Sequence, residues 1–359
     1  MIVQHLSTAG NLNAVRAAAI TGYGEPLEVG DFPDPSPKSH GVVLRVEATG
    51  ICRSDWHAWM GHDLVPRLPH VPGHEMAGTI AALGDEVTKW RVGDRVTVPF
   101  SIGCGICRSC REGHLNTCDS LFTPGFTHWG SFAELVAISH ADVNLVHVPD
   151  TIENTHAAAL GCRFITSYRA VVDRGRIEEG EWLAVHGCGG VGLSAVMIGS
   201  ALGARVVAVD ITDEALEMAG ELGCEVMVNA REVDPVEAVR EATGGGAHVS
   251  IDALGTATTA INSILSLRKH GRHVQVGLLL ADDATPPIPM DPVIAGELEI
   301  LGSRGMPATD YPRVFEMIEK GRVDPGKLVT NTVSLDDASP VLEAMGRFGG
   351  VGVTVIDRF

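Results

Sequence analysis

The sequence predicts an α/β protein with two domains, one rich in β-strands and one built on a doubly wound parallel sheet. Short strand-like runs, punctuated by glycine and proline, fill the chain from about residue 13 to residue 144. After about residue 162, apolar strands alternate with helical segments, which is typical of a parallel sheet covered on both faces. The length of 359 residues also fits about two domains.

The β-rich domain is expected to use both ends of the chain. A helix over 311–320 follows the doubly wound region, and a last apolar strand over 352–356 is expected to return to the first domain. We therefore assign residues 1–162 and 304–359 to the β-rich domain and residues 163–303 to the doubly wound domain. In the first part, strands are expected at 42–48, 78–83 and 95–99.

The doubly wound domain is expected to alternate regularly between strand and helix. Asp213 stands at the start of an amphipathic segment, where its carboxylate is able to cap a helix. The strands are expected at 181–187, 205–210, 225–229, 248–253 and 272–277, and the helices at 191–203, 213–222, 235–243 and 258–269.

Charge and hydropathy exclude several classes of protein. The chain carries 27 Lys and Arg against 45 Asp and Glu, a net charge of −18, so we expect no nucleic-acid partner, because binding phosphates requires a basic face. The most apolar region, 191–209, is interrupted by glycine, serine and Arg205, so no membrane span is expected. Residues 1–13 do not have the pattern of a signal peptide. We therefore expect a soluble cytoplasmic protein.

A glycine-rich turn predicts a dinucleotide site. Gly187, Gly189 and Gly192 supply a G-x-G-x-x-G pattern, with Gly190 and Val191 inside it, between a predicted strand and a predicted helix. Asp210 ends the next strand, where its carboxylate can bind ribose hydroxyls and would repel a 2′-phosphate, so NAD is favoured over NADP. The alternative is a structural glycine turn, with Asp210 capping a helix.

Four of the eight cysteines lie within fifteen residues. A disulfide scaffold is typical of short secreted chains and does not fit this one. Four closely spaced thiolates suit a closed, structural zinc site, whereas an iron–sulfur cluster or free thiols are the alternatives. The predicted ligands are Cys104, Cys107, Cys110 and Cys118.

Three further segments contain possible metal ligands. Residues 50–57 hold Cys52, Ser54, Asp55 and His57, residues 72–75 hold His74 and Glu75, and Gly161 precedes Cys162. Each is a weak signal alone, since a single cysteine or histidine is more often a packed or hydrogen-bonded residue. Spacing does not show whether these segments converge.

Together these residues resemble the zinc-dependent alcohol dehydrogenases of the medium-chain dehydrogenase/reductase family. The segments 50–57 and 73–75, the four-cysteine loop, Gly161-Cys162 and the glycine turn occur in the family's order, from about Ala14 to the C-terminus. The resemblance implies a GroES-like catalytic domain and a Rossmann domain. It also implies reversible, NAD-dependent oxidation of primary or secondary alcohols to aldehydes or ketones. The short segment between Cys118 and Gly130 resembles that of tetrameric members, so we expect a homotetramer.

The resemblance assigns roles around a catalytic zinc, giving two zinc ions per chain. Cys52, His74 and Cys162 would bind this zinc and leave a fourth position for water or alcohol. Glu75 would lie beside the metal, and Asp55 would orient His74. Polyol dehydrogenases of the family generally carry an acidic residue in place of Cys162, which favours simple alcohols here.

It also assigns roles toward the cofactor and the proton. Ser54 would pass the proton through the nicotinamide ribose to His57, Arg53 would contact the pyrophosphate, and Thr166 and Val191 would hold the nicotinamide. Three aromatic residues are candidates for the wall of the substrate pocket, and packing in the core is the alternative for each of them. These are Phe100, Trp59 and Trp129.

One feature departs from the family's pattern. Members often carry a basic residue in the final strand that contacts the cofactor phosphates, but here residues 351–354 read Val-Gly-Val-Thr. Arg304 and Arg358 are the two residues of the tail that we consider as substitutes for this contact. Two functional alternatives stay open: a relative specialised for a bulkier aromatic, terpenoid or polyol alcohol, and a non-catalytic binding or structural member.

Overall fold

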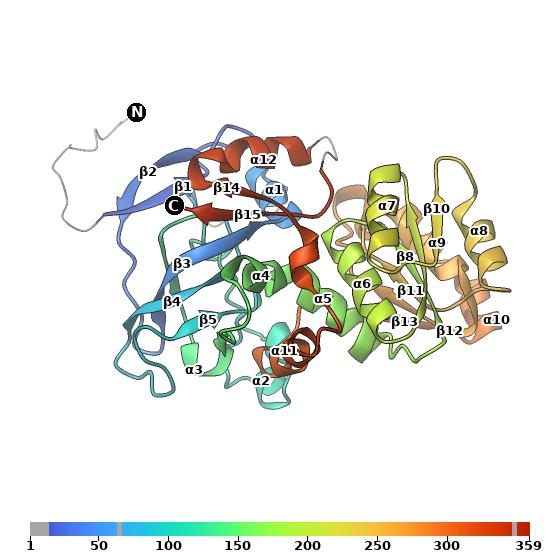
Figure 1. The fold of residues 1–359 in the computed structure, drawn as a ribbon, viewed down its shortest axis with the longest axis horizontal. Helices are drawn as coiled ribbons and strands as arrows, with labels where there is room; N and C mark the ends of the chain where they lie inside the picture. Colours follow the sequence, from blue (N-terminus) through green and yellow to red (C-terminus); the bar gives the residue numbers. More distant parts are fainter. Residues whose placement is uncertain (1–13, 63–66, 347–349) are drawn as a thin grey trace.

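The computed structural model describes residues 14–62, 67–346 and 350–359, and it forms two lobes, each built on its own large sheet (Figure 1). Residues 1–13, which we expect not to be a signal peptide, lie outside the described residues. Within the described ranges, no helix has both the length and the apolar character needed to cross a membrane.

The N-terminal lobe contains a mixed seven-stranded sheet and a separate β1–β2 pair. The main order is β14-β15-β3-β4-β5-β7, with β6 paired to β3. Strand β15 lies antiparallel to β3, so the C-terminal strand returns to this lobe as predicted. The strands are β1 Ala14–Ala19, β2 Glu28–Pro33, β3 Val42–Ile51, β4 Glu75–Leu83, β5 Arg95–Thr97, β6 Leu135–Ile138, β7 Val146–His147, β14 Val329–Ser334 and β15 Val353–Arg358.

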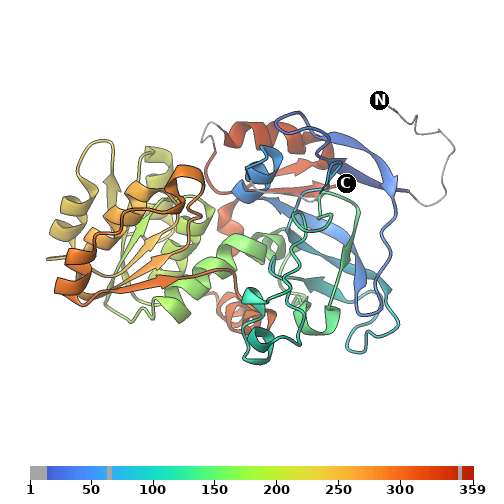
Figure 2. The ribbon, with the colours of Figure 1, turned by 180° about the vertical axis from the view of Figure 1, so that it is seen from behind.

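The second lobe is a six-stranded, entirely parallel sheet in the order β10-β9-β8-β11-β12-β13. Helices lie on both of its faces, which Figure 2 shows from behind, so the predicted doubly wound domain is confirmed. The strands are β8 Trp182–His186, β9 Arg205–Asp210, β10 Val226–Asn229, β11 Ala247–Asp252, β12 Leu267–Gln275 and β13 Glu299–Gly302. The helices are α6 Gly190–Ala201, α7 Asp213–Glu221, α8 Pro235–Ala242, α9 Ala257–Leu265 and α10 Met290–Gly296.

Two local predictions in this lobe are wrong. The helix predicted over 258–269 ends at Leu265, because buried Leu267 pairs with Ala247 of β11 and starts β12. The N-cap of α7 is Thr212 rather than Asp213. The backbone N–H of Thr212 donates to the Asp210 carboxylate at 3.1 Å, so a side chain from the end of β9 satisfies one backbone donor at this helix start.

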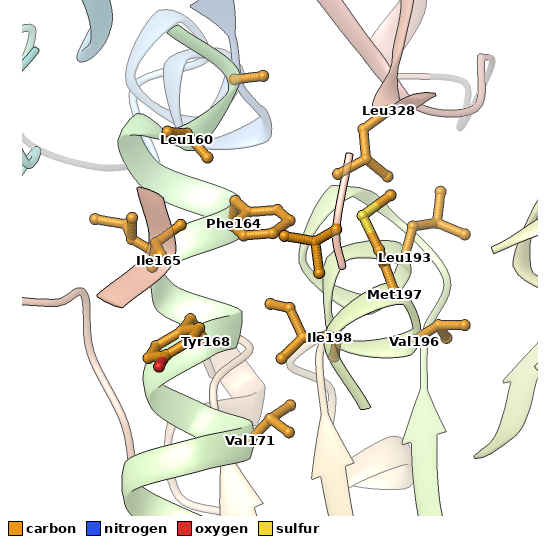
Figure 3. Close-up of a cluster of buried hydrophobic side chains, with 14 of the residues drawn as sticks. Leu160, Phe164, Ile165, Tyr168, Val171, Leu193, Val196, Met197, Ile198 and Leu328 are labelled. Carbon is orange, nitrogen blue, oxygen red and sulfur yellow. The ribbon is translucent and has the colours of Figure 1, made fainter. Parts of the chain in front are cut away.

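A nearly continuous helical run joins the two lobes. It comprises α4 Asn154–Ala159, a π-helical turn Leu160–Phe164, α5 Ile165–Tyr168 and a second π-helical turn Arg169–Arg174. Its apolar side chains pack against α6, so the two lobes share one buried core (Figure 3). The labelled contacts are Leu160, Phe164, Ile165, Tyr168 and Val171 from this run, Leu193, Val196, Met197 and Ile198 from α6, and Leu328. The remaining α-helices are α1 Arg53–Trp59, α2 Arg108–Arg111, α3 Ala141–Asn144, α11 Tyr311–Glu319 and α12 Ala338–Met345.

The core of the parallel sheet contains a histidine that should make stability depend on pH. His186, at the end of β8, is buried, and among the described residues its Nε2 has no hydrogen-bond partner. Burial, together with nearby His273, lowers the pKa of His186 to about 3. Below pH 6.5 this histidine is therefore protonated in the unfolded chain but stays neutral in the folded protein. Each further pH unit down to about 3 should cost about 1.4 kcal/mol of folding free energy.

His186→Gln should flatten this dependence. Between pH 6.5 and 5, we expect the free energy of unfolding, measured in urea, to fall by about 2 kcal/mol less in the variant than in the wild type. His147→Gln, at an exposed position on β7, is the matched control and should leave the slope unchanged. Equal slopes for His186→Gln and the wild type would show that His186 is protonated in the folded state.

Candidate active site

Four side chains from distant parts of the sequence converge between the lobes. One ligand atom each of Cys52, His74, Glu75 and Cys162 lies within 4.8 Å of all the others. The pairing of β3 with β4 explains part of this convergence, because Gly50 is aligned with Glu75 and the two strands therefore bring Cys52 and His74 to the same end of the sheet. Cys162 reaches the cluster from the π-helical turn, an irregularity that is frequent at functional sites.

Asp55 fixes the geometry of two of the ligand segments. Its carboxylate is fully buried and accepts hydrogen bonds from the backbone N–H of Cys52 at 2.8 Å and of Gly73 at 3.0 Å. The ring Nδ1 of His74 donates to the same carboxylate at 2.9 Å. Burial alone would lower the pKa of His74, but Asp55 and the Cys52 thiol raise it well above its usual value. This geometry agrees with the role that the family resemblance implies for Asp55, which is to orient the ring of His74.

The donor atoms of this cluster fit a transition metal. Because Asp55 occupies Nδ1, Nε2 of His74 is left buried and, within the described part of the chain, without a hydrogen-bond partner. A hydrogen bond from Cys162 lowers the pKa of Cys52 well below its usual range, and the same contact, with burial, raises the pKa of Cys162. Two sulfurs and one imidazole nitrogen are a donor set that zinc favours, with a fourth position left open.

Glu75 is held by a partner that the sequence did not suggest. Arg163 donates from Nε to Glu75 Oε1 at 2.9 Å and from Nη2 to Oε2. Burial raises the pKa of Glu75 to about 7, although the Arg163 guanidinium opposes this shift. The signal available was an arginine within a run of otherwise largely apolar residues, directly after Cys162.

The four-cysteine loop forms a second cluster. The ligand atoms of Cys104, Cys107, Cys110 and Cys118 also lie within 4.8 Å of one another, and all eight cysteines are free. The Cys107 and Cys118 sulfurs are 3.8 Å apart, which equals the spacing of about 3.8 Å between two sulfurs bound tetrahedrally at about 2.3 Å from zinc. A hydrogen bond from the backbone near Ile106 lowers the pKa of Cys104 to about 7, which favours its thiolate. This cluster fits a closed zinc site.

The glycine turn lies at the carboxyl end of β8, where dinucleotides bind in this class of sheet. Gly187 has a φ of 93°, and a side chain at Gly192 would place a Cβ 1.8 Å from the Gly187 carbonyl oxygen. Both positions therefore require glycine. Asp210 accepts a hydrogen bond from the backbone N–H of Cys188 at 2.6 Å, so its carboxylate lies against the turn. Gly189 and Gly190 complete the approach to α6.

The predicted proton-relay and cofactor residues take different places. Ser54 Oγ lies 3.9 Å from Cys52 Sγ, next to the first cluster. His57 lies on α1 with its Nδ1 3.3 Å from that of His62. The Arg53 guanidinium stacks on the Trp56 ring at 4.2 Å and donates to the carbonyl of Met345. Its contact with the cofactor pyrophosphate stays a prediction.

Two residues predicted to hold the nicotinamide lie where the helical run meets α6. Thr166 is buried on α5, and its Oγ1 has no partner among the described residues. Val191 lies in the first turn of α6, and its carbonyl accepts a hydrogen bond from Ser167 Oγ at 2.6 Å.

The aromatic residues near the first cluster are only partly those that we predicted. Phe100 packs edge-on to His74 with ring centroids 6.1 Å apart, and Phe126, which sequence reasoning missed, does so at 5.3 Å. Trp59 instead belongs to the core around β1 and donates to the carbonyl of Glu25 at 2.5 Å. Trp129 packs against Phe32. Phe100 and Phe126 are therefore the aromatic walls beside the metal ligands.

Fold and site together define a zinc-binding dehydrogenase, and family comparisons agree. Residues 38–150 match the model of the alcohol dehydrogenase GroES-like domain, and residues 190–320 match that of the zinc-binding dehydrogenase. The NAD-dependent alcohol dehydrogenase of Sulfurisphaera tokodaii is 34% identical over 354 residues, covering 95% of this chain and 99% of that protein. The chain belongs to the family of medium-chain, zinc-type alcohol dehydrogenases.

Solved structures agree along nearly the whole chain. Alcohol dehydrogenase TADH from Thermus sp. ATN1 is 28% identical with a TM-score of 0.88, and the match covers 95% of this chain and 99% of that one. Benzyl alcohol dehydrogenase from Acinetobacter calcoaceticus is 26% identical with a TM-score of 0.90, and the match covers 97% and 100%. The GroES-like and Rossmann fold class that the sequence predicted is confirmed.

Proposed function

We propose that this protein is an NAD- and zinc-dependent alcohol dehydrogenase that reversibly oxidises primary or secondary alcohols to aldehydes or ketones. The observation that carries the proposal is the convergence of Cys52, His74 and Cys162 between the lobes, next to a glycine turn suited to a dinucleotide. Two cysteines and one histidine with an exchangeable fourth position are the known ligand set of a catalytic zinc in alcohol dehydrogenases.

The chemical task is to remove a proton and a hydride from an alcohol. Zinc, when bound, supplies the acidity, since it lowers the pKa of bound water from about 15.7 to about 7 and acts on an alcohol in the same direction. NAD, when bound, accepts the hydride. The protein's own residues must therefore orient these groups and move one proton to solvent.

The described side chains are arranged for that work. Asp55 accepts from His74 Nδ1 and so directs Nε2 toward the sulfurs of the cluster. Ser54, next to Cys52, would take up the alcohol proton while passing its own hydroxyl proton on toward His57, farther along α1, which would release a proton to solvent. Glu75 is held in place by Arg163 beside the cluster.

The preference for NAD is proposed from the charge of Asp210. This carboxylate stands at the end of β9 and lies against the glycine turn through Cys188. A negative charge there favours the free ribose hydroxyls of NAD and would repel the 2′-phosphate of NADP. Thr166 and Val191 would hold the nicotinamide ring.

A second candidate is preference for an aromatic alcohol. Phe100 and Phe126 flank the ring of His74, and such walls favour a flat apolar substrate. One structural neighbour is named a benzyl alcohol dehydrogenase. Of the three bulkier classes of substrate left open by the sequence, aromatic alcohols are therefore favoured over terpenoid alcohols and polyols.

A panel assay tests both candidates. The zinc-loaded enzyme should form NADH from at least one of ethanol, propan-2-ol and benzyl alcohol, and should do so better than it forms NADPH. A higher kcat/KM for benzyl alcohol than for ethanol would support the aromatic candidate. No NADH formation with any short, branched or aromatic alcohol would overturn the proposed activity.

Assembly and location extend the proposal. We infer a homotetramer from the short segment between Cys118 and Gly130, and a cytoplasmic location from the acidic, globular composition. Light scattering on the purified protein measures the first.

A further inference from the structure

The proposed mechanism gives the buried Arg163 guanidinium one task, which is to hold Glu75 beside the metal cluster. The Arg163 side chain is 7% exposed and that of Glu75 is fully buried, and two guanidinium nitrogens donate to the two carboxylate oxygens. A two-point contact of this kind fixes the orientation of both groups. The guanidinium is thereby committed to Glu75.

The surrounding backbone leaves room for this pair at two glycines. A Cβ at Gly50, on β3, would lie 2.1 Å from Glu75 Oε2, and a Cβ at Gly190 would lie 2.3 Å from Arg163 Cδ. Any side chain at either position would displace the pair. Gly190 is also the first residue of α6, in the glycine turn. The Arg163 side chain therefore spans the distance from the metal cluster to the dinucleotide turn.

The helical run holds Arg163 firmly against α6. Ser167 Oγ lies 2.9 Å from the carbonyl oxygen of Arg163 and 2.6 Å from that of Val191, so it can donate to either. Figure 3 shows Phe164, the next residue, within the apolar contact between this run and α6. A movement of the first turn of α6 would therefore be transmitted to Arg163.

We propose that Arg163 is a positioning residue that holds the Glu75 carboxylate away from the open metal position and couples it to the dinucleotide turn. This inference rests on the proposed function. A carboxylate oxygen is an ordinary zinc ligand, and one of Glu75 lies within 4.8 Å of the ligand atoms of Cys52, His74 and Cys162. Without Arg163, Glu75 would compete for the fourth position. Because coupling between sites is reciprocal, releasing Glu75 would also weaken dinucleotide binding.

The test uses Arg163→Met, which removes the guanidinium but keeps a stem against Gly190. It is measured by NADH fluorescence titration and, after exchange of the catalytic zinc for cobalt, by the visible absorption of Co²⁺. We expect the NADH dissociation constant to rise by about fivefold to 150-fold, the range typical of a coupling free energy between two sites. We also expect the cobalt spectrum to shift toward higher coordination. Neither measurement depends on turnover. A wild-type protein without alcohol dehydrogenase activity would therefore contradict the proposed function, whereas this inference is decided by NADH binding and the cobalt spectrum.

A second variant separates positioning from direct contact with the cofactor. In Arg163→Met/Glu75→Gln the competing charge is gone, so the cobalt spectrum and NADH binding should recover toward wild type. Arg163→Lys should recover them in part, and Arg169→Met, in the same helical run, should change neither. If the double variant binds NADH as poorly as Arg163→Met, Arg163 contacts the cofactor itself and the inference is wrong. Wild-type values in Arg163→Met would also overturn it.

Discussion

Cys162→Ala should lose one of two zinc ions per chain and reduce alcohol-dependent NADH formation by at least about a thousandfold. The fold-change follows from acidity, because bound zinc can shift the pKa of water by about 8.7 units, and each unit is a factor of ten in the population of the ionised form. Cys162 is one of three candidate ligands, and it is the one supplied by the helical run between the lobes. Its loss leaves Cys52 and His74, too few ligands for a tight site.

The measurement needs both metal content and activity. Metal analysis should find one zinc in the variant, held by the four-cysteine loop, and circular dichroism should be unchanged. Cys224→Ala is the matched control, because Cys224 lies in the lobe of the parallel sheet and its thiol faces the backbone carbonyls of Val206 and Val226. A Cys162→Ala protein with two zinc ions and full turnover would remove Cys162 from the ligand set.

The features predictable from sequence are those whose partners are close along the chain. The glycine turn and Asp210 belong to one β-α-β unit, so spacing alone places them together. The four-cysteine loop is local in the same way, and its ligands indeed converge. The strand–helix alternation was predictable for the same reason, since the central strands β8, β9 and β11 are almost entirely buried and so form nearly continuous apolar runs.

The first metal cluster depends on long-range contacts, which spacing does not contain. Cys52 and His74 come together because β3 pairs with β4, and Cys162 reaches them from a π-helical turn far along the chain. Resemblance to the family suggested this grouping, but it did not suggest Arg163. A π-helical turn changes which residues face inward, so helical periodicity could not assign Arg163 to Glu75. For Trp59 the sequence left both packing and the substrate pocket open, because an aromatic side chain suits a core and a pocket equally, and the structure places it in the core around β1.

The four-cysteine loop has little besides its thiols to hold it together. Among the residues that the structure describes, its small core consists of Cys110, Leu115 and Cys118, with Leu121 and the other two cysteines packed against it. The loop is attached to the rest of the lobe by hydrogen bonds, such as that from Asn116 Nδ2 to the Arg304 carbonyl at 2.6 Å. Apolar burial this small does not offset the entropy of ordering the segment, so bound metal must supply most of its stability.

Cys107→Ala should therefore remove the loop zinc and unfold the loop locally. Structural zinc binds with an apparent free energy on the order of 10 kcal/mol in isolated zinc fingers. Even about 3 kcal/mol of this, lost from the loop, would speed hydrogen exchange of its amides by about a hundredfold. Mass-resolved hydrogen exchange, with metal analysis, measures both effects. The zinc at Cys52, His74 and Cys162 should stay bound.

Ile106→Ala gives the matched comparison, because this side chain lies on the same loop and is 71% exposed. It should keep two zinc ions and wild-type exchange. If Cys107→Ala also keeps two zinc ions, the loop does not bind metal through this cysteine. If it loses one zinc but exchanges no faster, hydrogen bonds such as that of Asn116 suffice to order the loop. The contrast between the two variants thus separates metal from ordinary packing as the source of its order.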